Sequence, residues 1–326
     1  MRPFLLRRVL SLIPTFLGIT LVSFFIMHLA TGKPTDIMTD LNVKISLEAR
    51  EKLSELYGLD QPIPIQYVRW LGRTLRGDFG RSFSDQRPVL DKIAEAVPIT
   101  LGINALALLL ILMLAVPLGV FSAAREGSAL DTAGTWAVFI GFALPSFWVS
   151  LLALDLLGVR LGWLPVSGLS SLEADRMSAL PWLLDRARHL ILPVSVAVLG
   201  GLAGISRYVR SNMLQVLNQE YIRTARAKGL PERIVLFRHA LRNALLPLIT
   251  ILGLSIPGLI GGSVIMESIF AIPGMGRLFF GAVMGRDHPV IMGILVFGAL
   301  LTLLGNLLAD LAYAYADPRI RVGSSP

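Results

Sequence analysis

The sequence contains no cysteine, and charged residues are scarce. The absence of cysteine among 326 residues excludes disulfides, thiolate metal sites and cysteine nucleophiles. Only 16% of the residues are charged, 54% are hydrophobic and the mean hydropathy is +0.67, whereas a soluble domain has about 25% charged residues. This deficit of charge indicates that lipid, not water, surrounds much of the chain.

Sequence motifs for ATP hydrolysis and for metal catalysis are also missing. No GxxxxGK stretch followed by Ser or Thr occurs, so any ATP chemistry must reside on another chain. No HExxH spacing or Ser/His/Asp arrangement is present, and the 4 histidines lack zinc-ligand spacing. We therefore expect no enzymatic activity, no metal site and no cofactor in this chain.

Six apolar stretches have about the 20 residues that a membrane-spanning helix needs. The first of them follows three arginines, as in a signal peptide, but it is long for one and lacks a small-residue cleavage site. We expect a retained span and an all-α, polytopic membrane protein of about six transmembrane helices. The expected spans are residues 9–29, 100–124, 132–157, 190–205, 244–265 and 290–311.

The distribution of lysine and arginine predicts the orientation. With a cytoplasmic N-terminus, the inside segments hold 14 basic residues in 65 positions and the outside segments hold 16 in 122. Both termini are therefore expected in the cytoplasm. The expected organisation is a first helix at 1–30, an extracytoplasmic amphipathic segment at 31–98, a five-helix core at 99–313 and a cytoplasmic tail at 314–326.

The segment 31–98 is long enough to fold on the outer surface. Ser46 can cap one amphipathic helix that ends at Gly58. After Pro62 and Pro64, apolar residues again recur at helical spacing, namely Ile65, Val68, Leu71 and Leu75. We expect these helices to act as a lid or packing element, or as a docking surface for an extracytoplasmic partner.

A basic segment at 207–242 carries clear helix signals. Asn218 is expected to cap a short helix, YIRTARAK, which ends at Gly229 because glycine adopts the left-handed conformation easily. Pro231 suits the first turn of the next helix, which continues toward the fifth span. The segment could simply enforce topology, contact DNA as a helix-turn-helix, or act as a coupling helix for a soluble partner. The flanking spans and the lack of a third helix disfavour DNA.

Residues 220–247, EYIRTARAKGLPERIVLFRHALRNALLP, resemble the EAA-type coupling loop of ABC importer permeases, in the dipeptide/oligopeptide/nickel branch. Arg223, Thr224 and Ala225 replace the Glu-Ala-Ala of the general pattern, which is typical of that branch. The chain has TGKP at 31–34, where the branch often has PGDP. Further similar stretches occur in the same order along the chain: GDFG at 77–80 with RPV at 87–89, PSFW at 145–148, LGWLPVSG at 161–168, IF at 269–270 with PGMG at 273–276, and DPR at 317–319.

The resemblance implies a type I ABC importer permease in a bacterial or archaeal cytoplasmic membrane. It implies a heterodimer with a second permease, two ATPase subunits that bind ATP and Mg²⁺, an extracytoplasmic solute-binding protein and no nucleic acid. Peptides or related solutes would be imported, with a nickel chelate as the alternative. The residues expected to couple to the ATPase are Glu220, Tyr221, Arg223, Thr224, Ala225, Arg226, Ala227, Lys228, Gly229 and Leu230. Small Ala225 and Ala227 would permit a close approach of the partner.

The fifth span is rich in proline and glycine. These residues allow either ordinary close packing or a hinged helix that lines the pore. Acidic residues are few: Asp155 and Asp310 lie near span ends, where interfacial water is expected to solvate them. We expect Glu267 to face water, with an outer vestibule as the alternative. The candidate pore or hinge residues are Pro247, Gly253, Pro257, Gly261 and Glu267.

Two other function classes are less consistent with the sequence. A secondary transporter commonly has inverted repeats and buried ionisable groups near the membrane midplane. The sequence has no internal repeat and no midplane pair of carboxylates. A membrane-embedded enzyme would need one of the missing catalytic motifs.

Overall fold

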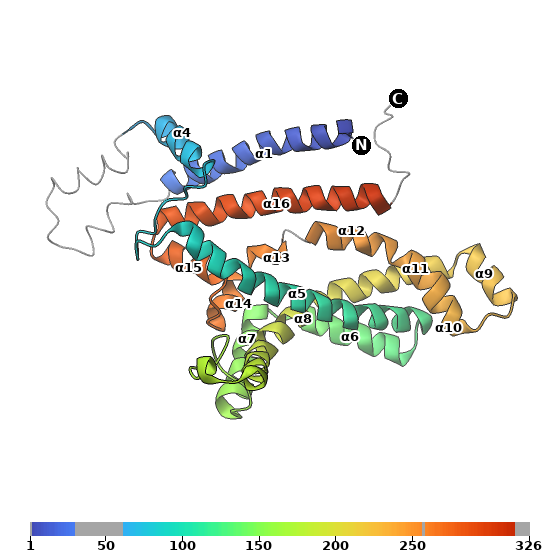
Figure 1. The fold of residues 1–326 in the computed structure, drawn as a ribbon. Helices are drawn as coiled ribbons and strands as arrows, with labels where there is room; N and C mark the ends of the chain where they lie inside the picture. Colours follow the sequence, from blue (N-terminus) through green and yellow to red (C-terminus); the bar gives the residue numbers. More distant parts are fainter. Residues whose placement is uncertain (1, 30–60, 256–257, 317–326) are drawn as a thin grey trace. The chain divides into compact units, whose positions relative to one another are not determined.

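A computed structural model describes residues 2–29, 61–255 and 258–316 (Figure 1). The expected helix between Ser46 and Gly58 lies outside the described residues, as do Pro257 and the stretch 317–319. In the described part the chain is helical, and one isolated bridge joins Arg81 to Pro88. The α-helices are α1 (Arg2–Leu29), α4 (Ile63–Thr74), α5 (Val89–Ala124), α6 (Ala129–Ala143), α7 (Ser146–Ala153), α8 (Ala179–Leu217), α9 (Glu220–Ala227), α10 (Glu232–Ile234), α11 (Leu241–Ala244), α12 (Leu246–Ser255), α13 (Gly258–Gly261), α14 (Val264–Ile269), α15 (Met275–Met284) and α16 (His288–Ala316).

Four of the described helices, α1, α5, α8 and α16, are long and apolar enough to cross a membrane. A fifth crossing is possible where α6 and α7 follow one another, but this pair is bent by 93°. The predicted third span, 132–157, is therefore not one continuous helix. The bend lies at Pro145, and the residue before a proline is driven out of helical geometry. Leu144 accordingly has ψ 130°.

The fifth predicted span, 244–265, is not one helix either. It is divided among α11, α12 and α13, and α14 begins only at Val264. Gly262 has φ +67°, and Ser263 caps α14 by accepting a hydrogen bond from the Met266 backbone N–H at 3.3 Å. A left-handed glycine followed by a new cap ends one helix and starts another.

Two helices are longer than the sequence predicted. The helix α5 begins at Val89 and not near 100. The helix α8 has 39 residues and a length of about 58 Å, compared with about 30 Å for a bilayer core. The basic segment predicted as a loop from residue 207 therefore begins as the last turns of α8. Helices of this length extend beyond the hydrocarbon at one end or both.

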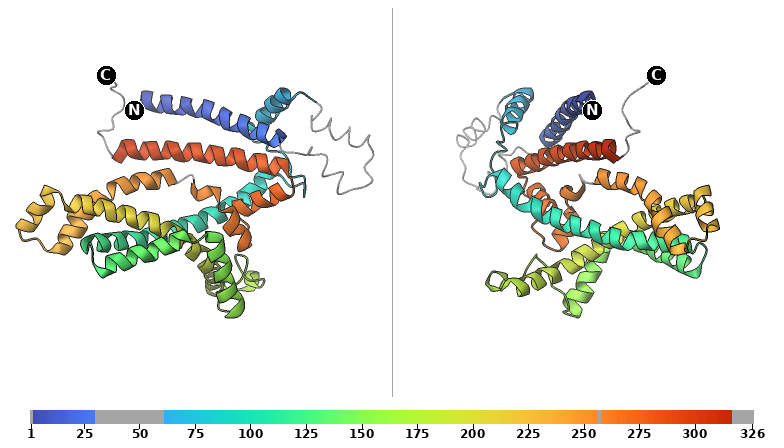
Figure 2. Two further views of the ribbon diagram at one scale, coloured as in Figure 1. Left: turned by 180° about the vertical axis from the view of Figure 1, so that it is seen from behind. Right: turned by 45° about the vertical axis from the view of Figure 1, so that its right-hand side comes forward.

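The chain folds as two compact units. The first contains residues 1–98 and 274–326, and the second contains residues 99–273. In the first unit α1 and α16 lie side by side (Figures 1 and 2). Gly293 permits close packing of α16 on the start of α5, because a Cβ at this position would lie 2.5 Å from Val89 Cγ1. The core of this unit contains Val89, Ile93, Ala96, Met275, Ala282, Val290, Ile291 and Ile294.

The helix α4 confirms the predicted second amphipathic helix, but a different face of it packs. Tyr67 lies against α1, where its hydroxyl is 3.0 Å from Thr20 Oγ1 and its ring meets Phe24. Val68 and Leu75, which were expected on the apolar face, are 67% and 68% exposed. Large aromatic side chains therefore decide which face packs on α1.

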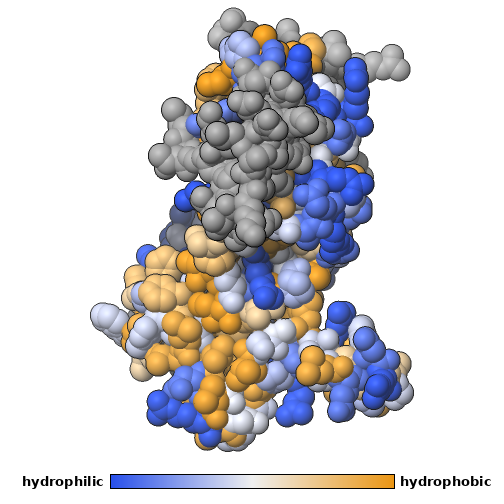
Figure 3. Space-filling view, turned by 90° about the vertical axis from the view of Figure 1, so that its left-hand side faces the viewer, coloured by the Kyte–Doolittle hydropathy of each residue, from blue (hydrophilic) through white to orange (hydrophobic). Residues whose placement is uncertain are grey.

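Large apolar side chains remain exposed on the long helices. Figure 3 shows broad apolar areas on one face of the molecule. Met113 of α5 and Trp136 of α6 are 62% and 65% exposed. Exposure on this scale is expected for helices that face lipid, whereas soluble monomers rarely expose large apolar patches.

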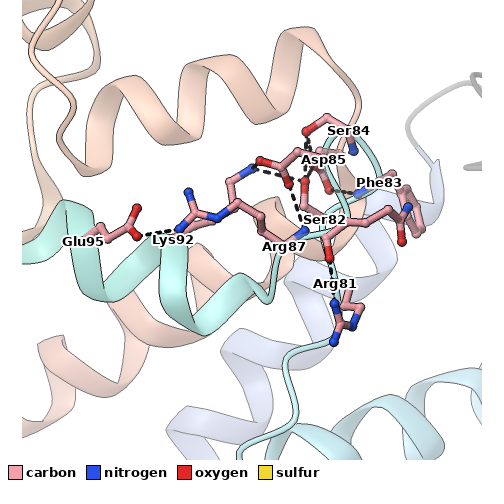
Figure 4. A network of polar contacts seen from close by, with 10 residues as sticks. Arg81, Ser82, Phe83, Ser84, Asp85, Arg87, Lys92 and Glu95 are labelled. Atoms are coloured by element: carbon pink, nitrogen blue, oxygen red, sulfur yellow. Dashed lines mark hydrogen bonds and ion pairs between the residues drawn. The ribbon is translucent and has the colours of Figure 1, made fainter.

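A polar loop before α5 is fixed by the carboxylate of Asp287. Asp287 is buried and accepts hydrogen bonds from Ser82 Oγ, from the Phe83 N–H at 3.0 Å and from Ser84 Oγ at 3.1 Å. Lys92 also contacts this loop, donating to Ser82 Oγ at 3.2 Å (Figure 4). We call Asp287 with residues 82–84 the Asp287 knot. It joins the start of α5 to the turn before α16.

Candidate functional site

The helix α9 and the turn after it form a corner between α8 and the fifth predicted span. We call residues 220–234 the α9 corner. The helix α9 begins after Gln219, whose backbone is extended at φ −78° and ψ 148°. The predicted cap, Asn218, is wrong: this residue ends α8, and its side-chain amide donates to the Leu214 carbonyl at 3.0 Å. The helix therefore starts without a side-chain cap.

Gly229 ends α9, as the sequence predicted. Its φ is +76°, and its N–H donates to the Arg226 carbonyl at 2.9 Å. A Cβ at this position would have no neighbour within 4 Å, so the backbone conformation, not crowding, requires glycine. Pro231 lies one position earlier than predicted, since it directly precedes α10 with ψ 140°.

An ion pair crosses the corner. The Arg226 guanidinium donates to both carboxylate oxygens of Glu232, with Nε to Oε2 at 3.2 Å and Nη2 to Oε1 at 2.7 Å. This hydrogen bonding to Glu232 raises the pKa of Arg226. The two side chains are 44% and 55% exposed, so the pair contributes about 1 kcal/mol at most. The bidentate geometry matters more here, because it fixes the angle between α9 and α10.

The inner face of α9 is anchored in the second unit. Ile222 is fully buried and Ala225 is 7% exposed, in a core with Val209 and Met213 of α8. Leu230 is partly buried against the same core. The expectation that Ala225 permits close approach of a partner is therefore wrong, because this side chain faces the chain's own helices. The corner is a packed extension of the helical core.

The outer face of α9 is polar and exposed. Tyr221 is 43% exposed, and its hydroxyl accepts from the Asn243 amide at 2.8 Å. Arg223 pairs with Glu220 at 2.9 Å. Asn243 was not singled out from the sequence, because its partner is 22 positions away and no local periodicity relates them. The expected coupling residues that are exposed are Glu220, Tyr221, Arg223, Thr224, Arg226, Ala227, Lys228 and Gly229.

The interrupted fifth span is held by polar side chains of α5. Glu267 of α14 is 5% exposed and accepts a hydrogen bond from Thr100 Oγ1 at 2.8 Å. The expectation that Glu267 faces water is therefore wrong. One turn further along α5, the Asn104 amide donates to the carbonyl of Leu259 in α13 at 2.7 Å. Residues four apart share a helix face, so one face of α5 contacts both pieces of the broken span.

Further contacts hold α14 within the second unit. Ser150 of α7 donates to Met266 Sδ at 2.9 Å, and the Gly168 N–H donates to the Phe270 carbonyl at 2.8 Å. The other pore or hinge candidates differ in exposure. Gly253 is half-buried in α12, whereas Pro247 and Gly261 are exposed. Half-buried and exposed positions thus alternate along this stretch.

Asp155 and Asp310 were both expected at span ends, and the structure describes the side chain of Asp155 only. Asp155 lies in a π-helical turn, Leu154–Arg160, and forms an exposed ion pair with Arg160 at 2.8 Å. The side chain of Asp310 lies outside the described residues. Within the described residues, no group of three or more His, Asp or Glu side chains is placed to hold a metal ion.

The comparisons with known proteins cover nearly the whole chain. Residues 115–322 match the family "binding-protein-dependent transport system inner membrane component", and residues 1–104 match the corresponding N-terminal family. The oligopeptide transport system permease protein AppB of Bacillus subtilis is 48% identical over 321 residues, which are 98% of this chain and 99% of that protein. A Brucella suis protein provisionally named a peptide permease is 40% identical over 319 residues, 97% of this chain and 98% of that protein.

A solved structure of similar fold is an inward-facing form of the MetNI methionine ABC transporter. It is 18% identical, covers 70% of this chain and 97% of that chain, and has a TM-score of 0.55. At this identity the likeness concerns the fold alone. The near full-length sequence matches show the family directly: this multi-pass membrane protein belongs to the binding-protein-dependent transport system inner membrane components and has the fold of an ABC importer permease.

Proposed function

We propose that this chain is a pore-forming permease subunit of an ATP-driven importer for di- or oligopeptides. The substrate class rests on the oligopeptide permease of Bacillus subtilis, which matches the chain over almost its full length. The coupling role rests on the α9 corner. It is an exposed polar helix, fixed from below by buried Ile222 and ended by a left-handed Gly229.

The α9 corner can transmit force because it is stiff. Its core connects it to α5 and α8, and α10 continues through the π-helical segment Val235–Ala240 into α11 and α12. A soluble ATPase that grips the exposed face of α9 would therefore move these helices together. This chain contributes α9 as the helix that the ATPase binds, while ATP and Mg²⁺ bind on two partner ATPase subunits.

The orientation follows from the same assignment. The α9 corner faces the cytoplasm, together with both termini, and the loop of the Asp287 knot faces outward toward a solute-binding protein. A second, homologous permease completes the pore, since the interrupted α12–α14 stretch of one chain lines only part of a pathway. In this stretch α14 is anchored by Thr100 and Ser150. The helix α12, to which the α9 corner is connected through α10 and α11, is the part that moves.

Gly229→Pro tests the coupling role. Proline cannot adopt φ +76° and lacks the N–H that Gly229 donates to Arg226. We expect the complex with its ATPases to assemble in the membrane but to lose most peptide uptake per ATP hydrolysed in proteoliposomes. Gly77→Pro is the matched control, because Gly77 also has a left-handed φ of +81° with no neighbour within 4 Å.

Two results would contradict the proposal. One is normal uptake per ATP in Gly229→Pro. The other is a location of the α9 corner on the extracytoplasmic side of the membrane. Because the chain has no cysteine, a single Lys228→Cys substitution at an exposed site gives a unique label. An impermeant maleimide must reach this cysteine only from the side on which ATP is supplied.

A further inference from the structure

An ion pair between a buried carboxylate and a half-buried guanidinium ties α6 to α8 close to the α9 corner. Asp131 is 6% exposed. Arg210 donates to both of its carboxylate oxygens, with Nε to Oδ1 and Nη2 to Oδ2 each at 2.8 Å. Ser122 Oγ of α5 donates to the same carboxylate, and the Gly127 N–H donates to it at 3.1 Å. We call Asp131, Arg210, Ser122 and Gly127 the Asp131 clamp.

The clamp uses the same helix ends that carry the α9 corner. Ser122 is followed by Ala123, and Arg210 is preceded by Val209. Both Ala123 and Val209 belong to the core that buries Ile222 of α9. Adjacent residues on α5 and on α8 therefore join the core that buries Ile222 through one side chain and bind Asp131 of α6 through the next. Any displacement of α9 reaches the clamp through these helix ends.

The helices α5 and α8 are in close contact at this level. A Cβ on Gly119 would lie 2.7 Å from the Ser206 carbonyl, so these two helices pack backbone to backbone. The helix α6 also packs along α8. A cavity of about 370 Å³ lies beside the clamp and is lined from α5, α6 and α8. Apolar packing is incomplete there, so the ion pair supplies a directional link between α6 and the α5–α8 pair.

Buried ion pairs are costly to form but still more costly to break on one side, because removal of one partner leaves an uncompensated charge. A bidentate arginine–carboxylate pair also fixes direction, which a contact between apolar side chains does not. We propose that Asp131 and Arg210 are positioning residues that transmit movement of the α9 corner to α6 during transport. This inference rests on the proposed coupling role of α9.

The test compares one-sided and two-sided removal of the pair. Asp131→Asn, Arg210→Gln and the double variant are assembled with the partner permease and ATPases in proteoliposomes. Peptide uptake per ATP hydrolysed and thermal unfolding are both measured. If the Asp131 clamp has a purely structural role, each single variant should be less stable than wild type. The double variant should then regain both stability and uptake per ATP, because no unpaired buried charge remains.

A positioning role predicts a different pattern. In the double variant stability recovers, but uptake per ATP stays about tenfold below wild type. Arg210→Lys keeps the positive charge but cannot donate to both carboxylate oxygens in a bidentate pair. We expect this variant to retain part of the wild-type uptake per ATP. Arg207→Gln is the control, because this arginine lies one turn earlier on α8 and stacks on the Phe139 ring at 4.5 Å. We expect wild-type coupling in the control.

The outcomes separate this inference from the proposed function. Wild-type uptake per ATP in the double variant, together with lost coupling in Gly229→Pro, would overturn the role of the clamp alone. Peptide uptake that needs no ATP in the wild-type complex would overturn the proposed function and the clamp's role with it. Low uptake per ATP in a stable double variant supports both.

Discussion

Asp131 and Asp287 are both buried aspartates, but different donors satisfy them. Asp287 is 2% exposed and accepts hydrogen bonds from hydroxyl and backbone donors of residues 82–84, which are consecutive in one loop. Asp131 accepts a bidentate pair from Arg210, which lies 79 positions away on another helix. The first arrangement fixes one loop against the turn before α16. The second joins two long helices through a charge, so it can pass displacement from one helix to the other.

The largest effect on stability is expected from Asp287→Ala. This change leaves the Ser82 hydroxyl and the Phe83 N–H without their acceptor. Each buried donor left unsatisfied costs about 1–3 kcal/mol. We expect a loss of about 3 kcal/mol in the free energy of unfolding, together with faster amide hydrogen exchange at residues 82–84. At saturating solute-binding protein, molecules that remain folded should keep wild-type uptake per ATP, in contrast to variants of the Asp131 clamp.

This prediction sharpens the difference between the two aspartates. Asp287→Asn is the control, because the amide keeps one oxygen as an acceptor. Unchanged unfolding in Asp287→Ala would show that the knot does not hold the loop. Lost coupling with full stability would show instead that the knot, like the clamp, takes part in transmission.

An intermediate effect is expected from Thr100→Val. The substitution keeps the shape of the side chain but removes the donor to buried Glu267. A loss of about 1–2 kcal/mol in unfolding free energy should result, and protection of α14 from hydrogen exchange should fall. Thr302→Val serves as a control, since this exposed threonine donates only within α16, to the Gly298 carbonyl at 2.8 Å. Equal losses in the two variants would argue against the Thr100 contact as an anchor.

The smallest effect concerns pH and the loop of the Asp287 knot. The hydrogen bond from Lys92 lowers the pKa of Asp85 to about 2. A depressed carboxyl pKa contributes stability that is present above the unfolded value of about 3.9 and is lost as pH falls toward 2. The wild-type loop should therefore resist pepsin at pH 4 and become sensitive between about pH 4 and 2.

Lys92→Met should move this sensitivity to higher pH, because the main cause of the pKa shift is removed. Asp85 is 41% exposed, so solvent screening keeps the effect small. A loop with the same pepsin sensitivity in wild type and Lys92→Met would show that the Lys92–Asp85 contact does not stabilise it.

The sequence predicted features that local chemistry determines. Gly229 was identifiable because a helix followed by a left-handed residue favours glycine, and the structure confirms it. The helix α4 was identifiable from its spacing, but the face that packs was not, since that depends on Phe24 of another helix. Local rules therefore identified one helix and one glycine end, but not the contacts that select the packing face.

Contacts between distant positions were missed. Glu267 was expected to face water, yet its donor Thr100 lies 167 positions earlier. The Asp131–Arg210 pair also joins positions far apart in sequence, and neither residue was singled out. A signal for the α5 contacts exists in retrospect, because Thr100 and Asn104 are polar, four apart and in an apolar stretch. Their partners could not be identified without the three-dimensional arrangement.

The length of α8 has a consequence for the direction of signalling. The helix continues through Pro193 from Ala179 to Leu217, so a tilt of about 10° around the middle of its roughly 58 Å would shift each end by about 5 Å. Such a lever works equally in both directions. A displacement of the helix at Ala179 would appear at Leu217, close to the start of α9, and a displacement at α9 would likewise appear at Ala179. A protein bound at the α9 corner and a contact near Ala179 would thus be coupled mechanically through this one helix.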